Sequence, residues 1–216
     1  MISDLTLAQL ETLAFTGRPL VICDVDEVVV HFTRDFEDYL AAQDLLLDTS
    51  SFALNGNVRC RRTGAPAPDE HVARLISSFF DERTRHMQPI DGAVDSLLTI
   101  GETADVVLLT NLPHTAGDHR RANLAGHGLP FPVVTNSGPK GPAIRDILRR
   151  ARQPAVFIDD SPSYIASCFE HAPEVHLVHF LHDERFARHV EPLGFVSLRT
   201  ASWDEARPHI LELIRG

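Results

Sequence analysis

Acidic side chains follow two apolar segments that lie far apart in the chain. Asp24 and Asp26 come directly after the apolar residues 20–23, and Asp159 and Asp160 come directly after residues 155–158. A carboxylate next to a hydrophobic core is costly unless a cation or hydrogen-bond donors accompany it. The pattern therefore favours a site that holds cations, although an acidic surface turn is the alternative as long as residues 24–27 are considered alone.

The only lysine of the chain provides a second chemical signal. Of the 20 lysine and arginine residues 19 are arginines, and Lys140 stands in the loop segment GPKGP at residues 138–142. An arginine-rich source could explain the bias. A lysine ammonium is nevertheless a compact point charge on a flexible stem, whereas the arginine guanidinium is a planar fork. The loop is therefore a candidate for a role that needs an ammonium.

Apolar segments with the length of buried strands alternate with helical segments. The predicted strands cover residues 20–23, 105–109, 131–135, 155–158, 175–180 and 195–198. The predicted helices cover residues 92–100, 115–125 and 142–150, a segment that begins at Ser161-Pro162 and a last segment that begins near Ser202. This alternation is typical of an α/β protein whose parallel sheet is covered by helices on both faces.

A parallel sheet of this kind binds its ligands at the carboxyl ends of the strands. The side chains that would meet there are Asp24, Asp26, Thr110, Asn111, Lys140, Asp159 and Asp160. Two unit charges 4 Å apart repel by about 4 kcal/mol at an effective dielectric constant near 20, so four carboxylates need cations among them. Lys140 supplies one positive charge, and we expect a hard divalent ion, Mg²⁺, to supply the rest. Mg²⁺ held by a few carboxylates is the usual arrangement for phosphoryl chemistry.

Residues 33–88 interrupt this alternation. Helical periodicity extends over residues 34–47. Residues 51–54 and 58–62 flank Asn55-Gly56, which is a strong hairpin signal, and a further helix is predicted from Asp69 to about Arg83. We therefore expect a helix–hairpin–helix insertion at residues 33–88 in a core that is formed by residues 1–32 and 89–216.

Composition restricts the function classes. The chain has 216 residues and a formal net charge of −10, which disfavours nucleic acid as a partner because binding its phosphate backbone requires a positive surface. No apolar run approaches the roughly 18 residues of a membrane span, and the first residues lack a signal pattern. We therefore expect no membrane partner and a cytoplasmic location. Cys23, Cys60 and Cys168 lack the spacing of zinc sites or disulfide frameworks and are expected to be free thiols.

Four motifs, in this order, resemble those of the haloacid dehalogenase-like (HAD) superfamily, whose members are mostly phosphohydrolases. The motifs are Asp24-x-Asp26 after an apolar strand, Thr110-Asn111, Lys140 and Asp159-Asp160. The resemblance covers residues 20–30 and 105–168, and the insertion corresponds in position to the first type of cap in this superfamily (C1). It implies a Rossmann-like parallel sheet flanked by helices, the HAD-like core, with a small helix–hairpin–helix cap.

The resemblance also implies catalytic roles. Asp24 would be the nucleophile that forms an aspartyl-phosphate, and Asp26 would protonate the leaving oxygen and then activate water. Thr110 and Asn111 would bind phosphate oxygens. Lys140 would neutralise charge on the nucleophile and the phosphate.

The metal ligands implied by the resemblance are Asp24, the backbone carbonyl of Asp26, and Asp160. Asp159 would act through water or pair with Lys140. Together these roles describe a Mg²⁺-dependent phosphohydrolase of a small phosphorylated metabolite, with the insertion as a lid over the site.

Several alternatives stay open at this point. Glu27-Val28 stands where many members have Gly-Thr, and the fourth motif is a double aspartate, so the subfamily is not determined. Asp26 argues against dehalogenases, which ordinarily lack this second aspartate, and residues 33–88 contain no lysine for the imine of phosphonate-cleaving members. A phosphomutase or phosphotransferase that uses the same aspartate, and a catalytically silent binding module, are the remaining alternatives. The insertion arginines either contact an anionic substrate or form a solvated basic turn: Arg59, Arg61 and Arg62.

Overall fold

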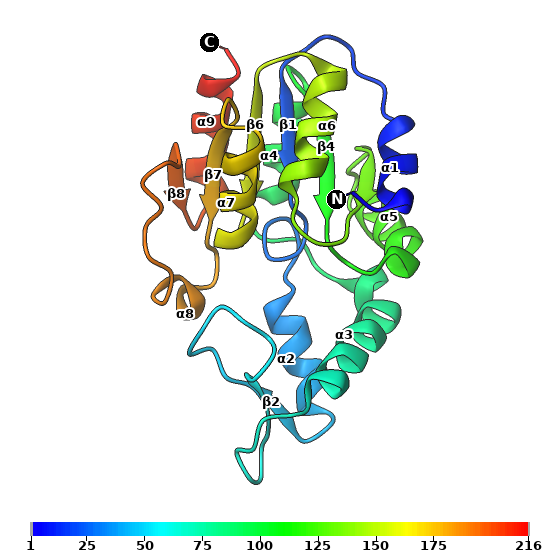
Figure 1. Cartoon of the computed structure of the whole chain (residues 1–216), viewed down its shortest axis with the longest axis vertical. Helices are drawn as coiled ribbons and strands as arrows, with labels where there is room; N and C mark the ends of the chain where they lie inside the picture. The colour runs from blue at the N-terminus through cyan, green and yellow to red at the C-terminus, as the bar shows by residue number, and fades with distance from the viewer. Residues whose placement is uncertain (1, 216) are drawn as a thin grey trace.

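The computed structural model describes residues 2–215. Its centre is a six-stranded parallel sheet with the strand order β5-β4-β1-β6-β7-β8 (Figure 1). The strands are β1 (Leu20–Cys23), β4 (Asp105–Thr110), β5 (Val133–Thr135), β6 (Ala155–Asp159), β7 (His176–Phe180) and β8 (Leu198–Thr200). β1 pairs with both β4 and β6, and all its side chains are buried. The predicted α/β fold with a parallel sheet is confirmed.

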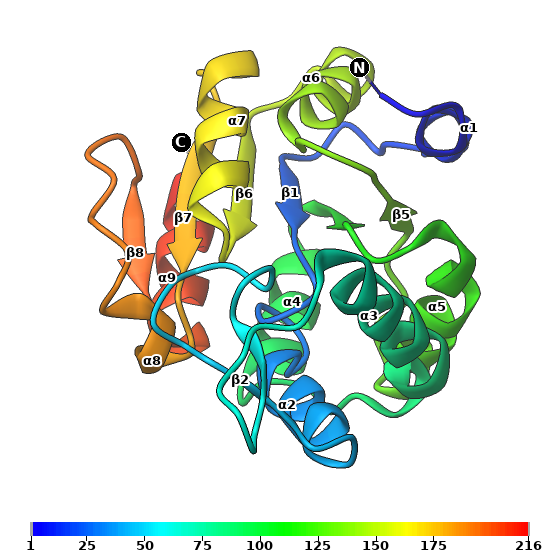
Figure 2. The ribbon, with the colours of Figure 1, turned by 60° about the horizontal axis from the view of Figure 1, so that its bottom comes forward.

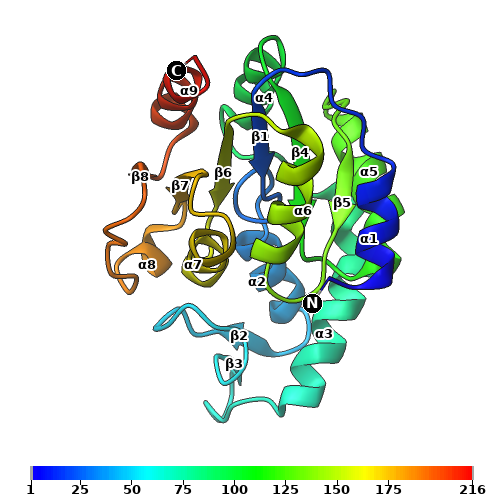
Figure 3. The same cartoon turned by 45° about the horizontal axis from the view of Figure 1, so that its top comes forward.

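Helices cover both faces of the sheet (Figure 3). One face carries α1 (Asp4–Glu11), α6 (Gly141–Ala151) and α7 (Pro162–His171), and the other carries α4 (Ala93–Gly101), α5 (Gly117–Gly126) and α9 (Trp203–Leu213). Alternate residues of β1 serve the two cores. Leu20 and Ile22 pack with α1, α6 and α7, whereas Val21 and Cys23 pack with α4 and α9. The short elements η2 (His114–Ala116) and α8 (Glu184–Ala187) follow β4 and β7.

Residues 33–88 form a smaller layer beyond the carboxyl ends of the strands (Figures 1 and 2). This layer contains α2 (Thr33–Ala41), the antiparallel ribbon of β2 (Leu45–Leu47) and β3 (Val58–Cys60), α3 (Asp69–Arg83) and η1 (Thr84–His86). The two chain segments that join it to the sheet are paired with each other. His31 N–H donates to the Gln88 carbonyl at 3.0 Å, and Ile90 N–H donates to the Val29 carbonyl at 2.8 Å.

Two predicted elements of this layer are wrong. The helix predicted over residues 34–47 ends at Ala41, because Asp44 has a φ of +58° that is incompatible with a continued helix. Leu45 and Leu47 are then buried while Leu46 between them is not, which is the alternation of a strand. The first strand of the ribbon is therefore 45–47 and not 51–54.

The segment predicted as a strand at residues 51–54 belongs to an irregular loop that also contains Asn55-Gly56. The side chain of Asn57 holds this loop: its Nδ2 donates to the Ser51 carbonyl at 3.2 Å and to the Ala53 carbonyl at 2.9 Å. A side chain that satisfies the loop carbonyls from within replaces the ladder of a second strand.

Within the described part of the chain, no helix has the length and apolar character needed to cross a membrane. The three cysteines are free thiols there, and Cys23 and Cys168 are buried.

Candidate active site

The ammonium of Lys140 lies between two carboxylates that come from different strands. Its Nζ donates to Asp24 Oδ1 at 2.5 Å and to Asp159 Oδ2 at 2.6 Å. Asp24 follows β1, Asp159 ends β6, and Lys140 directly precedes α6. The side chains of Lys140 and Asp159 are fully buried, and that of Asp24 is 7% exposed. The fold thus brings three of the predicted site residues into direct contact.

Lys140 reaches this position because α6 approaches α7 closely. A Cβ atom at Gly141 would lie 2.1 Å from the backbone oxygen of Ser167, so any side chain at this position would force the two helices apart. The Gly141 N–H instead donates to Ser167 Oγ at 3.1 Å.

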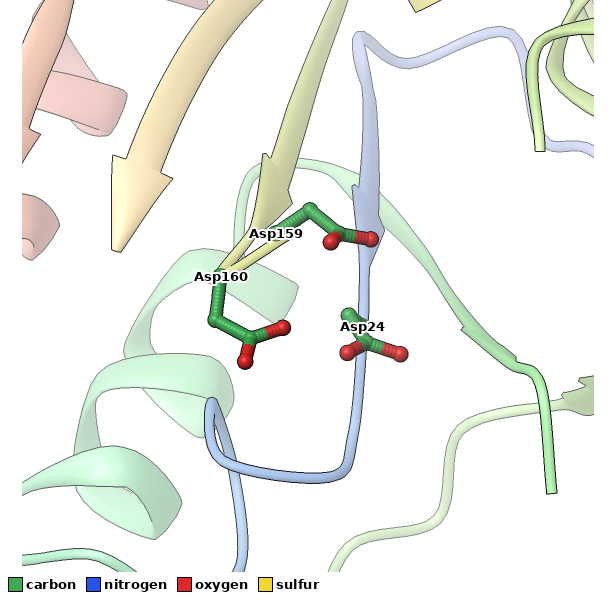
Figure 4. Close-up of side chains that lie close together, drawn as sticks. All are labelled: Asp24, Asp159 and Asp160. Atoms are coloured by element: carbon green, nitrogen blue, oxygen red, sulfur yellow. The ribbon is translucent and has the colours of Figure 1, made fainter. Parts of the chain in front are cut away.

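Three carboxylates form an acidic cluster (Figure 4), and Lys140 contacts two of them. One oxygen from each of Asp24, Asp159 and Asp160 lies within 4.8 Å of the others. Asp159 uses both of its oxygens inside the protein, because Oδ2 accepts from Lys140 and Oδ1 accepts from the Ser161 N–H at 2.8 Å. Asp24 keeps one oxygen available, and the Asp160 side chain points into the same space (Figure 4). Asp24 and Asp160 are therefore the side chains whose donor set fits a hard divalent cation.

Burial makes these acids difficult to ionise without a further cation. It raises the pKa of Asp24 to about 7, although the charge of Lys140 opposes the shift. Burial also raises the pKa of Asp159, and burial together with the other two carboxylates raises the pKa of Asp160 well above its usual range. For Lys140, burial alone would lower the pKa, but Asp159 and Asp24 raise it above its ordinary value. The single positive charge of Lys140 does not balance three carboxylates, whereas Lys140 and a divalent cation together would.

Asp26 is held by two side chains from neighbouring elements. Thr110 Oγ1, at the end of β4, donates to Asp26 Oδ2 at 3.0 Å, and the guanidinium of Arg120 in α5 donates to Asp26 Oδ1. Thr110 and Arg120 are fully buried, whereas the Asp26 side chain is 17% exposed. Thr110 thus binds Asp26 from within the core, and of these two side chains only that of Asp26 lines the cavity.

Arg120 is absent from the predicted site. Its guanidinium also donates to Asn123 Oδ1 at 3.2 Å and contacts Met87 Sδ at 3.4 Å, and Asn123 Nδ2 donates to the Met87 carbonyl at 2.8 Å. These bonds connect Asp26 to the segment that returns to the sheet after η1. Its position in the sequence is the one feature that could have indicated this role. Arg120 shares the buried face of α5 with Asn123 and Leu124, and a buried arginine requires a partner.

The side chain of Asn111 is engaged within the protein. Its Nδ2 donates to the Gly138 carbonyl and to the Tyr164 hydroxyl, both at 2.8 Å, and its Oδ1 accepts from Asn136 Nδ2 at 2.9 Å. These bonds fix the loop that leads to Lys140. A contact from the Asn111 amide to a phosphate would have to replace one of them.

Glu27 has a φ of +63°, in the left-handed region where residues other than glycine are uncommon. Its Oε2 accepts from the N–H groups of Phe32 at 3.1 Å and Thr33 at 2.7 Å, at the beginning of α2. The first N–H groups of a helix have no partner within the helix, so Glu27 provides one. These two hydrogen bonds offset the backbone strain at Glu27.

A cavity of about 430 Å³ lies between the acidic cluster and residues 33–88. At one end it is lined by Asp24, Asp26, Asn111 and Asp160. The opposite wall comes from residues 33–88 and from α8, and it is largely apolar. The cavity has the size of a pocket for a small molecule, and it opens directly onto the carboxylates.

Solved structures with a similar fold exist. A HAD-family hydrolase from Deinococcus radiodurans with bound phosphate and sodium is 18% identical, with a TM-score of 0.60 over 90% of this chain and 95% of that one. YfnB from Bacillus subtilis, bound to magnesium and showing interdomain movement, is 16% identical, with a TM-score of 0.63 over 90% and 98%. CbbY from Rhodobacter sphaeroides in complex with phosphate is 16% identical, with a TM-score of 0.59 over 87% and 96%.

No protein-family model and no curated protein matches the sequence. The similarity is therefore one of three-dimensional fold, and it assigns no role to an individual residue.

Proposed function

Because the chain has the fold of the haloacid dehalogenase-like hydrolases, we propose that it is a Mg²⁺-dependent phosphohydrolase that cleaves a small phosphorylated metabolite through an aspartyl-phosphate on Asp24. The observation that carries this proposal is the position of Lys140. Its ammonium contacts both Asp24 and Asp159 while the carboxylate of Asp160 is directed into the same space.

In the proposed first step, an oxygen of Asp24 attacks the phosphorus atom and the bond from phosphorus to the leaving oxygen breaks. Asp26, whose carboxyl group also lines this end of the cavity, donates the proton that the leaving oxygen takes up. In the second step Asp26 accepts a proton from water. The resulting hydroxide attacks phosphorus, which breaks its bond to Asp24 and releases inorganic phosphate.

Lys140 and the metal have complementary tasks in this proposal. Lys140 favours the ionised, nucleophilic form of Asp24, and Asp159 holds the ammonium in place. Mg²⁺ would be held by Asp24, Asp160 and the backbone carbonyl of Asp26, and it would neutralise phosphate charge. Asn111 orders the loop before Lys140, and Thr110 holds Asp26. The phosphate contacts predicted for Thr110 and Asn111 would require these hydrogen bonds to be exchanged for bonds to phosphate oxygens.

We also propose that residues 33–88 act as a lid that shields the phosphorylated intermediate from bulk water. The cavity lies between this layer and the acidic cluster, and the hinges would be at residues 32–33 and 88–89. Hydrogen exchange at these hinges that does not respond to a phosphate mimic such as vanadate would contradict the lid.

The proposal is tested by measuring phosphate release from an aryl phosphate with Mg²⁺ and with excess chelator. We expect release that depends on Mg²⁺. Transfer of phosphate to a second position of a sugar phosphate, with no free phosphate, would indicate a mutase instead. Absence of both reactions across a panel of phosphorylated metabolites would indicate a binding module.

Metal binding is expected to stabilise the protein more at pH 8 than at pH 5. The pKa of Asp24 is about 7 in the folded chain and about 3.9 in an unfolded one. Its contribution to the free energy of unfolding is therefore fully present below pH 4 and is lost as the pH rises through 7. Mg²⁺ binds the ionised carboxylates and reverses this loss, so the rise in Tm that it causes should grow with pH.

Thermal melts with Mg²⁺ and with chelator at both pH values check this expectation. A difference of 1 kcal/mol corresponds to about 2–4 °C in Tm for a chain of this size. Asp160→Asn should lose most of the response, whereas Asp81→Asn, at an exposed position of α3, should keep it. An equal Tm shift at pH 5 and pH 8 would contradict the metal assignment.

Replacing Arg120 with methionine is expected to lower kcat by about 10²-fold with little change in KM. Methionine fills much of the buried volume but removes the cation that holds Asp26, and a misplacement of about 1 Å at a reacting group costs on this order. Steady-state kinetics with an aryl phosphate separate the two parameters.

The matched control is Arg121→Met, because Arg121 is the next residue of α5 but is 47% exposed and pairs with Asp118 at the surface. It should retain wild-type kinetics. An Arg120→Met variant that folds and keeps its kcat would show that Arg120 is only structural.

A further inference from the structure

We infer that the alcohol released from the substrate is apolar and uncharged, so that the substrate is a phosphate monoester of an aliphatic or aromatic alcohol. This inference rests on the proposed function and names its substrate class. A substrate whose phosphate lies at the acidic cluster must place its leaving group against the opposite wall of the 430 Å³ cavity.

That wall is built from hydrophobic side chains. Phe52, Leu54, Ile76 and Phe80 come from residues 33–88, and Phe186 comes from α8. Phe52 and Phe186 meet edge to face with ring centroids 5.6 Å apart, which joins the two parts of the wall. Phe52, Leu54 and Ile76 are only partly buried, so part of their apolar surface is available to a ligand. Covering such surface with an apolar group is favourable, and covering it with a charged group is not.

The charged side chains of the lining are mostly carboxylates, which disfavours a second anionic group. Apart from the acidic cluster, its carboxylates are those of Asp26, Glu27 and Asp183, and its one imidazole is that of His182. Among residues 2–215, no lysine or arginine lines it. Arg185, in the neighbouring α8, is held by Asp183 at 2.6 Å and by Glu37 at 2.8 Å. A carboxylate or second phosphate on the leaving group would therefore enter a region where several carboxylates face one imidazole and where no ammonium or guanidinium is available.

The three arginines of the insertion add no positive charge to the cavity lining. Arg59 Nε donates to Asp48 Oδ2 at 3.1 Å, and Arg61 Nε donates to the Leu45 carbonyl at 3.0 Å. Arg62 is exposed, and none of the three lines the cavity. The solvated basic turn is thus the alternative that agrees with the structure, and these residues offer no contact for an anionic substrate.

A homologous series of alkyl phosphates tests the inference. We expect kcat/KM to rise from ethyl to butyl to hexyl phosphate by about fourfold per methylene until the cavity is filled, because burying one methylene is worth about 0.8 kcal/mol. Hexyl phosphate should be preferred over glucose 6-phosphate, which has equal carbon count but several hydroxyls. Both should be preferred over 3-phosphoglycerate, whose leaving group carries a carboxylate.

Variants that add the missing cation provide the second arm. Leu54→Arg and Ile76→Arg should flatten the alkyl series and raise kcat/KM for 3-phosphoglycerate. Leu98→Arg, at an exposed position of α4 away from the cavity, is the control and should leave both unchanged. Hydrolysis by the wild type with a flat or falling alkyl series, or with a preference for 3-phosphoglycerate, overturns the substrate class alone. Absence of hydrolysis of every ester overturns the proposed function and this inference together.

Discussion

Asp24→Asn should lower kcat/KM for an aryl phosphate by at least about 10⁴-fold, in line with the loss seen when a covalent nucleophile is removed. The amide has the shape of the carboxyl group but cannot form the bond to phosphorus. It can still accept a hydrogen bond from Lys140, whose second partner Asp159 is unaffected. We therefore expect the variant to fold.

Circular dichroism and phosphate release on the same preparation separate folding from catalysis. Asp81→Asn removes an exposed carboxylate on α3 and should keep full activity. If more than a tenth of the wild-type activity survived in folded Asp24→Asn, the covalent route through this residue would be ruled out.

Replacement of Lys140 with methionine is expected to destabilise the protein by about 3–5 kcal/mol and to abolish turnover. The substitution leaves Asp24 and Asp159 facing each other in the core without a counter-charge, and removing one partner of a buried ion pair costs on this order. For a chain of this size that corresponds to a fall in Tm of roughly 6–20 °C. Chemical denaturation at pH 7 gives the free energy directly.

Two comparisons make this experiment specific. Arg145→Met removes an exposed cation from the same helix, α6, and should change stability by less than about 0.5 kcal/mol. Adding Asp159→Asn to Lys140→Met removes one of the unpaired carboxylates and should recover part of the lost stability without restoring activity. Equal stability of wild type and Lys140→Met would show that the buried ammonium has no electrostatic role.

The central part of the site could be predicted from the sequence because it follows from strand ends. Asp24 and Asp159 each lie at the end of an apolar segment, and a parallel sheet places all such ends at one edge. Lys140 could be assigned to the same edge because a loop between a strand and a helix ends there. This placement depends on the strand ends alone and not on side-chain contacts. The strand order agrees with it, because β1 lies between β4 and β6.

The features of the structure that could not be predicted from the sequence depend on contacts that no periodic pattern encodes. Arg120 carries a charge on the buried face of α5, and its partner Asp26 is 94 residues away. Leu45–Leu47 continues the apolar character of α2, so the break at Asp44 is visible only in the backbone. Asn57 organises the following loop through its side chain, which composition does not reveal. Glu27 likewise holds a left-handed backbone conformation that two specific hydrogen bonds accompany.

The most direct test of the central claim is identification of the phosphorylated residue during turnover. Wild-type protein is mixed with an aryl phosphate and Mg²⁺, quenched with acid, and reduced with borohydride, which converts an acyl phosphate on aspartate into homoserine. Peptide mass spectrometry is then expected to find homoserine at position 24, and only when substrate was present. Turnover with an unmodified Asp24, or with the label on another residue, would contradict the account.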